Sequence, residues 1–152
     1  MPKASPRFKD SLSDVEGAGQ PEHCYQCSAC VAECPAARKF EGFNPREIVL
    51  ASLLGVADYL TDKDSVIWQC ATCYKCYERC PQGTRPVEVI TALKNVAAGE
   101  GNAPEENIAL TEAVLTSGSL LACSGTLEKR RSELGLPPAG KSTADLKALM
   151  GR

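Results

Sequence analysis

The longest apolar segments of the chain lie between residues 44 and 99 and follow helical spacing. Residues 44–47, Asn44-Pro45-Arg46-Glu47, predict a helix start, because asparagine is a favoured N-cap, proline suits the first helical position and glutamate stands three residues after the cap. Residues 48–54 are apolar on nearly all sides before Gly55, which predicts a buried helix. A shorter helical or turn segment is expected over residues 58–69.

The same helix start returns further along the chain. Pro86-Val87-Glu88-Val89-Ile90 echoes Pro45-Arg46-Glu47-Ile48-Val49, and apolar residues at helical spacing then continue to Gly99. Each copy follows a Cys-Pro pair, so the duplication covers most of residues 24–99. We therefore predict a core with pseudo-twofold symmetry.

Both ends of the chain carry weaker helical patterns. Residues 5–16 predict either a short amphipathic helix or a frayed tail that orders on a partner. Further helices are predicted from Pro104 to Gly118 and from Thr143 through Leu149, while the charged residues 124–140 are expected to form a loop. With few convincing strands, the pattern indicates an all-α fold.

Composition narrows the class of protein. The 152 residues are 43% hydrophobic without a long apolar run, which fits either one small soluble domain or a compact core with appendages and predicts no membrane span. A net charge of −2 and 5% aromatic residues disfavour a nucleic-acid-binding surface. The N-terminus lacks the apolar region of a secretory signal, so a cytoplasmic location is expected. Nine cysteines in that compartment favour metal binding over disulfides.

Eight of the cysteines form two identical runs of the pattern C-x2-C-x2-C-x3-C-P, which is typical of 4Fe-4S proteins. Two runs predict two 4Fe-4S clusters. In two-cluster proteins with this run, the cysteine before the proline ligates the other cluster. The predicted ligands are therefore Cys24, Cys27, Cys30 and Cys80 for cluster 1, and Cys34, Cys70, Cys73 and Cys76 for cluster 2. This crossing ties the two loops together and couples folding to cluster insertion.

Other chemistry in the chain is less specific. Structural zinc is the alternative to iron and sulfur, but it prefers two separated C-x2-C pairs. Cys123 lies outside both runs among apolar neighbours, and we expect a buried, inert thiol, with an external ligand or a redox thiol as the alternative. The single histidine, His23, is expected to pack or to hydrogen-bond near a cluster ligand. Lys75 and Arg79 predict a higher reduction potential for cluster 2, unless water screens their charges.

The two loops together with residues 42–49 and 67–83 closely resemble the HdrC family, the iron–sulfur C subunits of heterodisulfide reductase from methanogenic archaea. The resemblance covers about residues 22–100. It implies an α-helical ferredoxin-like core with two 4Fe-4S clusters on the eight cysteines named above. It also implies a relay that takes electrons from a flavin-containing, bifurcating subunit to a second subunit, which reduces the disulfide of coenzyme M and coenzyme B. A hydrogenase or formate dehydrogenase is the further partner that the resemblance implies.

The resulting interpretation divides the chain into an N-terminal helix or tail (1–21), a two-cluster domain (22–100) and a C-terminal helical extension (101–152). We expect an electron-transfer subunit of an oxidoreductase, with no substrate site of its own, because neither a dinucleotide fingerprint nor a nucleophile–base pair is apparent. The alternatives are a free-standing ferredoxin-like carrier, a redox sensor, or the iron–sulfur subunit of another oxidoreductase, of the succinate, fumarate or sulfur-metabolism type.

Overall fold

The computed structural model describes residues 4–15, 17–120, 123–139, 146 and 148. It divides into two compact units, Met1–Ala103 and Pro104–Arg152. Each unit is helical, and the described residues contain no strand. The all-α prediction is therefore confirmed for the part of the chain that the structure describes. No helix among these residues is long and apolar enough to cross a membrane.

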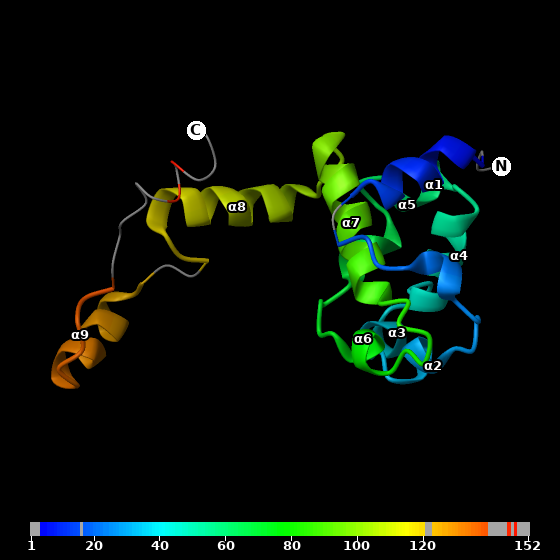
Figure 1. Ribbon diagram of the computed structural model, residues 1–152. Coiled ribbons are helices and arrows are strands. Elements are labelled where there is room, and N and C mark those ends of the chain that lie inside the picture. The colour runs from blue at the N-terminus through cyan, green and yellow to red at the C-terminus, as the bar shows by residue number, and fades with distance from the viewer. Residues whose placement is uncertain (1–3, 16, 121–122, 140–145, 147, 149–152) are drawn as a thin grey trace. The chain divides into compact units, whose positions relative to one another are not determined.

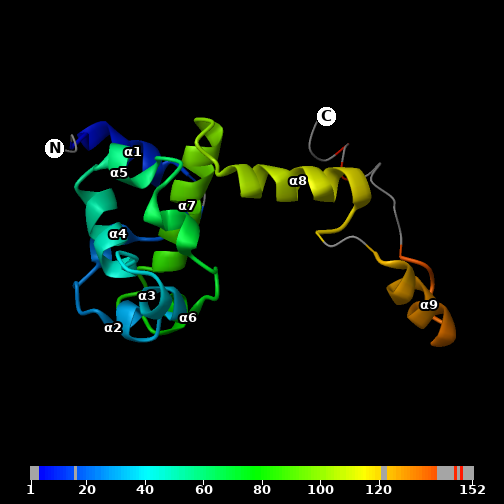
Figure 2. The ribbon, with the colours of Figure 1, turned by 180° about the vertical axis from the view of Figure 1, so that it is seen from behind.

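The first unit is built around two helices that lie side by side, α4 (Pro45–Leu53) and α7 (Pro86–Gly99). Short helical segments surround this pair: α1 (Pro6–Ser13), η1 (Pro21–His23), α2 (Ala29–Ala32), α3 (Pro35–Lys39), α5 (Ala57–Leu60), η2 (Val66–Gln69) and α6 (Lys75–Glu78). Figures 1 and 2 show α1 and α5 near one end of the unit and α2, α3 and α6 at the other. The end that carries α2, α3 and α6 holds both cysteine loops.

Local sequence signals explain where α4 begins. The side-chain oxygen of Asn44 accepts hydrogen bonds from the backbone N–H groups of Arg46 and Glu47, at 3.1 and 3.3 Å. The Asn44 amide in turn donates to the Glu47 carboxylate at 2.9 Å. Such a cap satisfies backbone donors that the first turn leaves without an intrahelical partner. The predicted helix start at residue 44 is confirmed.

The expectation of a buried helix over residues 48–54 is confirmed only in part. Ile48 and Val49 are fully buried against α7, but Leu50 is 39% exposed and Leu54 is 58% exposed. Helix α4 packs against α7, η1, α1, α2 and α5, but these elements leave part of its surface uncovered, and the leucines there meet solvent.

The N-terminal segment forms helix α1, and its apolar residues face the core. Phe8 and Leu12 are buried and Val15 packs against the same cluster. The backbone N–H of Ser5 donates to the carbonyl oxygen of Gly55 at 2.8 Å, which ties the start of α1 to the end of α4. Of the two predicted alternatives, the packed helix is the one found.

The second unit contains α8 (Glu105–Ser117) and α9 (Gly125–Glu133). Helix α8 ends at Gly118 as predicted, but α9 occupies residues that we expected to form a loop, and that expectation is wrong. The Ser124 hydroxyl accepts a hydrogen bond from the N–H of Leu127, and Arg130 pairs with Glu133 one turn later at 3.2 Å. A cap and such i,i+3 pairs support a helix without any apolar face. Of the helix predicted from Thr143, only Leu146 and Ala148 are described, and both are helical.

Candidate iron–sulfur centres

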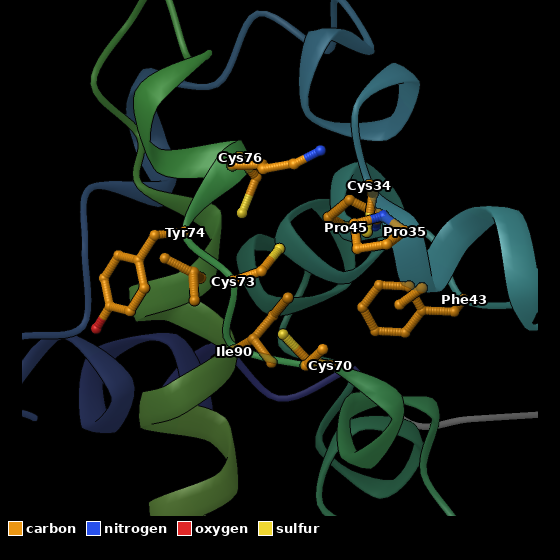
Figure 3. Close-up of a pocket in the computed structure, with 13 residues that line it drawn as sticks. Cys34, Pro35, Phe43, Pro45, Cys70, Cys73, Tyr74, Cys76 and Ile90 are labelled. Carbon is orange, nitrogen blue, oxygen red and sulfur yellow. The ribbon is translucent and has the colours of Figure 1, made fainter.

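The eight motif cysteines surround two cavities, with four cysteines at each. The Cys24 cavity is lined by Cys24, Cys27, Cys30 and Cys80. The Cys70 cavity is lined by Cys34, Cys70, Cys73 and Cys76. Each cavity therefore receives three cysteines from one loop and the cysteine before the proline from the other loop. Figure 3 shows the sulfur atoms of Cys70, Cys73 and Cys76 turned toward one space, with Phe43 at its edge.

The two loops adopt a left-handed backbone conformation at equivalent positions. Gln26 and Ser28 in the first loop have φ angles of 58° and 68°, and their equivalents Thr72 and Tyr74 have φ angles of 51° and 61°. Non-glycine residues adopt this left-handed conformation at an energetic cost, and they do so mainly at functional sites. Left-handed residues that alternate with right-handed or extended ones let successive N–H groups converge on an anionic group.

The cysteine of each Cys-Pro pair lies near a helix start. Cys34 is the N-cap of α3, and its Sγ accepts a hydrogen bond from the N–H of Ala37 at 3.5 Å. The N–H of Thr84 donates to the Sγ of Cys80 at 3.3 Å, just before α7 begins. At the Cys24 cavity the side-chain amide of Gln26 also donates to the Sγ of Cys24, at 3.2 Å. Hydrogen bonds to sulfur stabilise the thiolate form that binds iron.

The thiol pKa values of Cys30 and Cys76 reflect burial and the cysteines around them. Burial raises the pKa of Cys30 to about 11, and the negative charges of Cys24, Cys80 and Cys27 add to the effect. Burial likewise raises the pKa of Cys76 to about 12, with contributions from Cys70, Cys30 and Cys34. In the protein without iron, these two thiols are therefore protonated at neutral pH.

Cys80 behaves differently because hydrogen bonds outweigh its burial. Burial alone raises the pKa of Cys80, but the Thr84 hydroxyl and the backbone N–H groups of Gln82, Thr84 and Arg85 lower it to below the ordinary value. The Thr84 side chain is fully buried, and its hydroxyl has no partner at full hydrogen-bond geometry among the described atoms. This hydroxyl is directed at the sulfur atom of Cys80, which is why it lowers the pKa of that thiol.

The two cavities share a wall. Cys30 from α2 and Cys76 from α6 are each 8% exposed and belong to one small core with Val87, against which Tyr77 packs. On the outer sides, Cys27 and Cys73 are exposed, and they have Tyr25 and Tyr74 beside them in the cavity linings. Each cavity thus has one buried cysteine toward its neighbour and one exposed cysteine toward solvent.

The donor set around each cavity fits a 4Fe-4S cluster. Such a cluster binds four thiolates on four different irons, so the sulfur atoms surround it. Among the described residues, no three side chains of His, Cys, Asp or Glu meet closely enough to hold a single metal ion. Two buried donors at the Cys24 cavity also suit the sulfur atoms of an anionic cluster: Arg46 Nε, which has no partner among the described atoms, and Thr84 Oγ1, which is directed at Cys80.

Of the other residues singled out from the sequence, Lys75 lines the Cys70 cavity, whereas Cys123, His23 and Arg79 line neither cavity. Cys123 is exposed in the second unit, so the expected buried thiol is wrong. Helix α8, which precedes it, buries none of its side chains, so it offers no core to receive a thiol. His23 is exposed and does not line either cavity. Lys75 and Arg79 are also exposed, which favours the alternative that water screens their charges.

Sequence reasoning missed three functional candidates: Arg46, Thr84 and Lys94. Arg46 and Thr84 line the Cys24 cavity, and the Lys94 ammonium group donates to the carbonyl oxygen of Cys70 at 3.0 Å. A comparison of the two sequence repeats could have identified Arg46, because Arg46 stands where the other copy has Val87.

Comparison with known proteins identifies the domain type and the family. Residues 20–84 match the family described as a 4Fe-4S dicluster domain. The chain is 33% identical over 146 residues to the C2 subunit of the H2/formate:CoB-CoM heterodisulfide,ferredoxin reductase of Methanococcus maripaludis, covering 90% of this chain and 78% of that protein.

Two further relatives carry related names. The C 2 iron-sulfur subunit of the CoB–CoM heterodisulfide reductase of Methanocaldococcus jannaschii is 38% identical over 114 residues, which is 75% of this chain and 60% of that protein. The C subunit of the ferredoxin/F420H2-dependent CoB-CoM heterodisulfide reductase of Methanosarcina acetivorans is 36% identical over 129 residues, which is 84% of this chain and 78% of that protein. The chain therefore belongs to the HdrC family of heterodisulfide reductase iron–sulfur subunits, which have a helical 4Fe-4S ferredoxin-type domain.

Proposed function

We propose that the chain binds two 4Fe-4S clusters with crossed ligands. Cluster 1 takes Cys24, Cys27, Cys30 and Cys80 in the Cys24 cavity, and cluster 2 takes Cys34, Cys70, Cys73 and Cys76 in the Cys70 cavity. The support is the lining of two separate cavities by these two sets of four cysteines. The dicluster description of the matching family agrees with the number two.

We further propose that the chain is the electron-transfer subunit of a CoB–CoM heterodisulfide reductase complex, and that it relays electrons from the flavoprotein subunit to the disulfide-reducing subunit. A bound 4Fe-4S cluster supplies one-electron oxidation and reduction. The residues of this chain hold the two sites next to each other: the wall made by Cys30, Cys76 and Val87 excludes water between them. The exposed Cys27 and Cys73 lie where a partner's redox centre can approach each site.

The names of the relatives support the choice of complex. One relative is named for hydrogen and formate together with the heterodisulfide, which suggests a hydrogenase or formate dehydrogenase as the further partner of this chain. We place the reduction of the disulfide on the disulfide-reducing subunit, and we propose no substrate site on this chain. We also propose a cytoplasmic location, because all nine cysteines are unpaired.

The second unit is the proposed docking segment for other subunits. Ile108 and Leu110 of α8 are 45% and 48% exposed. A free-standing carrier or sensor, the alternative from another class of protein, has no need of a helical extension that keeps apolar side chains in solvent. The apolar residues of α1, by contrast, are used within the first unit, so we assign that helix no docking role.

The first experiment isolates the tagged chain anaerobically from its own host and measures native mass, bound subunits and iron. We expect a large assembly with a flavoprotein and a second cysteine-rich subunit, and about eight irons per chain, as two 4Fe-4S clusters require. If the chain is isolated alone with about eight irons, the proposed complex is contradicted, but the two proposed clusters are not. In that case the carrier or sensor alternative, or an iron–sulfur subunit of another oxidoreductase, replaces the relay.

Ligand variants test the cluster sites separately. Cys76→Ala should lose about four irons per chain, because it removes one of four ligands. Cys123→Ala is the matched control, since Cys123 lies in the second unit and lines neither cysteine cavity. A Cys76→Ala protein that keeps its full iron content contradicts the ligand assignment.

A further inference from the structure

The two cysteine cavities differ at one equivalent helical position. Arg46 and Val49 of α4 line the Cys24 cavity, and Val87 and Ile90 of α7 line the Cys70 cavity. These residues occupy matching places in the repeated helix starts, one and four positions after the proline. The duplication therefore places an arginine at one cavity and a valine at the other.

The guanidinium group of Arg46 has an unused donor inside the protein. Its Nε is buried and has no hydrogen-bond partner among the described atoms. Its Nη2 contacts the Glu47 carboxylate at 3.3 Å, and Glu47 is 59% exposed. Solvent screens that outer ion pair, so Glu47 neutralises the guanidinium group only weakly. A buried donor without a partner in the free chain indicates that an acceptor belongs there.

A second buried donor lies at the same cavity. Thr84 is fully buried, lines the Cys24 cavity and has a hydroxyl without an acceptor at full hydrogen-bond geometry. Two sulfur atoms of this cavity also accept hydrogen bonds, that of Cys80 from the backbone and that of Cys24 from the Gln26 amide. Donors thus gather around the sulfur atoms of this one site.

The Cys70 cavity lacks a matching pair of buried side-chain donors among the described residues. Val87, which replaces the arginine, is 1% exposed and apolar. The nearby cations are Lys75, which is exposed, and Lys94, whose Nζ donates to the carbonyl oxygen of Cys70 instead of a sulfur atom. Backbone N–H groups do reach sulfur atoms at this cavity: that of Ala37 donates to Cys34, and that of Val87 donates to Cys76.

We propose that the Nε–H of Arg46 and the hydroxyl of Thr84 donate hydrogen bonds to the sulfur atoms at cluster 1 and thereby raise its reduction potential. When one electron enters a 4Fe-4S cluster, no bond is broken and its negative charge grows by one, so donors and cations beside it stabilise the reduced state. Arg46 and Thr84 are thus residues that adjust one of the two potentials. This inference rests on the proposed ligand assignment.

The test is a redox titration of the full-length chain with both clusters loaded, followed by EPR, with dithionite as the reductant. Arg46→Met and Thr84→Val keep the side-chain volume nearly unchanged and remove the donors. We expect both variants to lower the same one of the two reduction potentials. The expected decrease is about 59 mV, which corresponds to about a tenfold change in the equilibrium constant for reduction. Arg46→Lys, which keeps the charge but loses the Nε–H, should give a smaller shift.

Arg130→Met is the matched control, because Arg130 is an exposed arginine of the second unit that lines neither cavity. The control should not change the reduction potential that Arg46→Met lowers. Iron content and the presence of two reduction steps report on the proposed clusters, whereas the selective shift reports on Arg46 and Thr84. If both potentials are unchanged in the Arg46→Met and Thr84→Val proteins, and each protein contains about eight irons, this inference is wrong. The proposed function is not affected by that result.

Discussion

The ammonium group of Lys94 donates a hydrogen bond of 3.0 Å to the carbonyl oxygen of Cys70. This bond joins the middle of α7 to the first cysteine of the second loop, 24 residues earlier in the chain. The same ammonium group lies 5.9 Å from the centre of the Trp68 ring. Burial lowers the pKa of Lys94, whereas the neighbouring Cys70 thiolate raises it. The start of the loop is therefore held by α7 as well as by its own backbone.

Lys94→Met should loosen the second loop while preserving the apolar contacts of the lysine stem. We expect a loss of about 1 kcal/mol in the free energy of unfolding, because a lost charged hydrogen bond is partly offset by removal of a half-buried charge. We also expect faster loss of iron to a chelator. Lys129→Met, at an exposed position of α9, serves as the control. Equal rates of iron loss from the two variants would show that the Lys94 bond does not hold the loop.

The cluster-free protein should lose stability at alkaline pH. The thiol pKa values of Cys30 and Cys76 rise in the folded chain from 9.0 to about 11 and about 12. Their contribution to stability is fully present below pH 9 and is lost as the pH rises through the folded pKa values.

Thermal unfolding of the cluster-free chain between pH 8 and pH 11 measures this effect. The Tm should fall across that range, and a Cys30→Ser/Cys76→Ser double variant should show a shallower fall. A Tm profile that is identical in the two proteins contradicts the assignment of the buried thiols as its cause.

Gly55→Ala should destabilise the first unit by about 1–3 kcal/mol. Gly55 has φ +69°, which strains other residues, and an added methyl group would overlap the backbone carbonyl of Ser5. The substitution would therefore displace α1 from the end of α4. Gly99→Ala is the control, because Gly99 lies in α7 with open space around it. Chemical denaturation should show Gly99→Ala to be neutral or stabilising, and equal losses in the two variants would refute this explanation.

Asn44→Ala should lower the free energy of unfolding by about 0.5–2 kcal/mol through loss of the N-cap. It should also reduce cluster loading at both sites, because Pro45 lines the Cys70 cavity and Arg46 lines the Cys24 cavity from the first turn of α4. Ser124→Ala removes the corresponding cap of α9 in the second unit. If iron content falls as much in Ser124→Ala as in Asn44→Ala, the capped turn of α4 has no special role at the cavities.

Much of this protein was predictable because its main signals are local. The spacing of each cysteine run and the prolines that follow it lie within a dozen residues, so they indicate a cluster loop without knowledge of the fold. Asn44, with Pro45 and Glu47, marks a helix start through bonds within one turn. The helix over Gly125–Glu133 was missed although its cap and ion pair are also local, because its charged composition is equally typical of a loop.

The sequence by itself determined the two loops, the helix starts and the family. Only the tertiary structure decided which side of α4 leaves Leu50 and Leu54 in solvent, and that Cys123 lies exposed. It also decided that Arg46 and Val87, equivalent in the repeat, line different cavities. The physical reason is that caps and motif spacing act within a few covalent bonds, whereas burial and hydrogen-bond partners depend on which distant segments pack together.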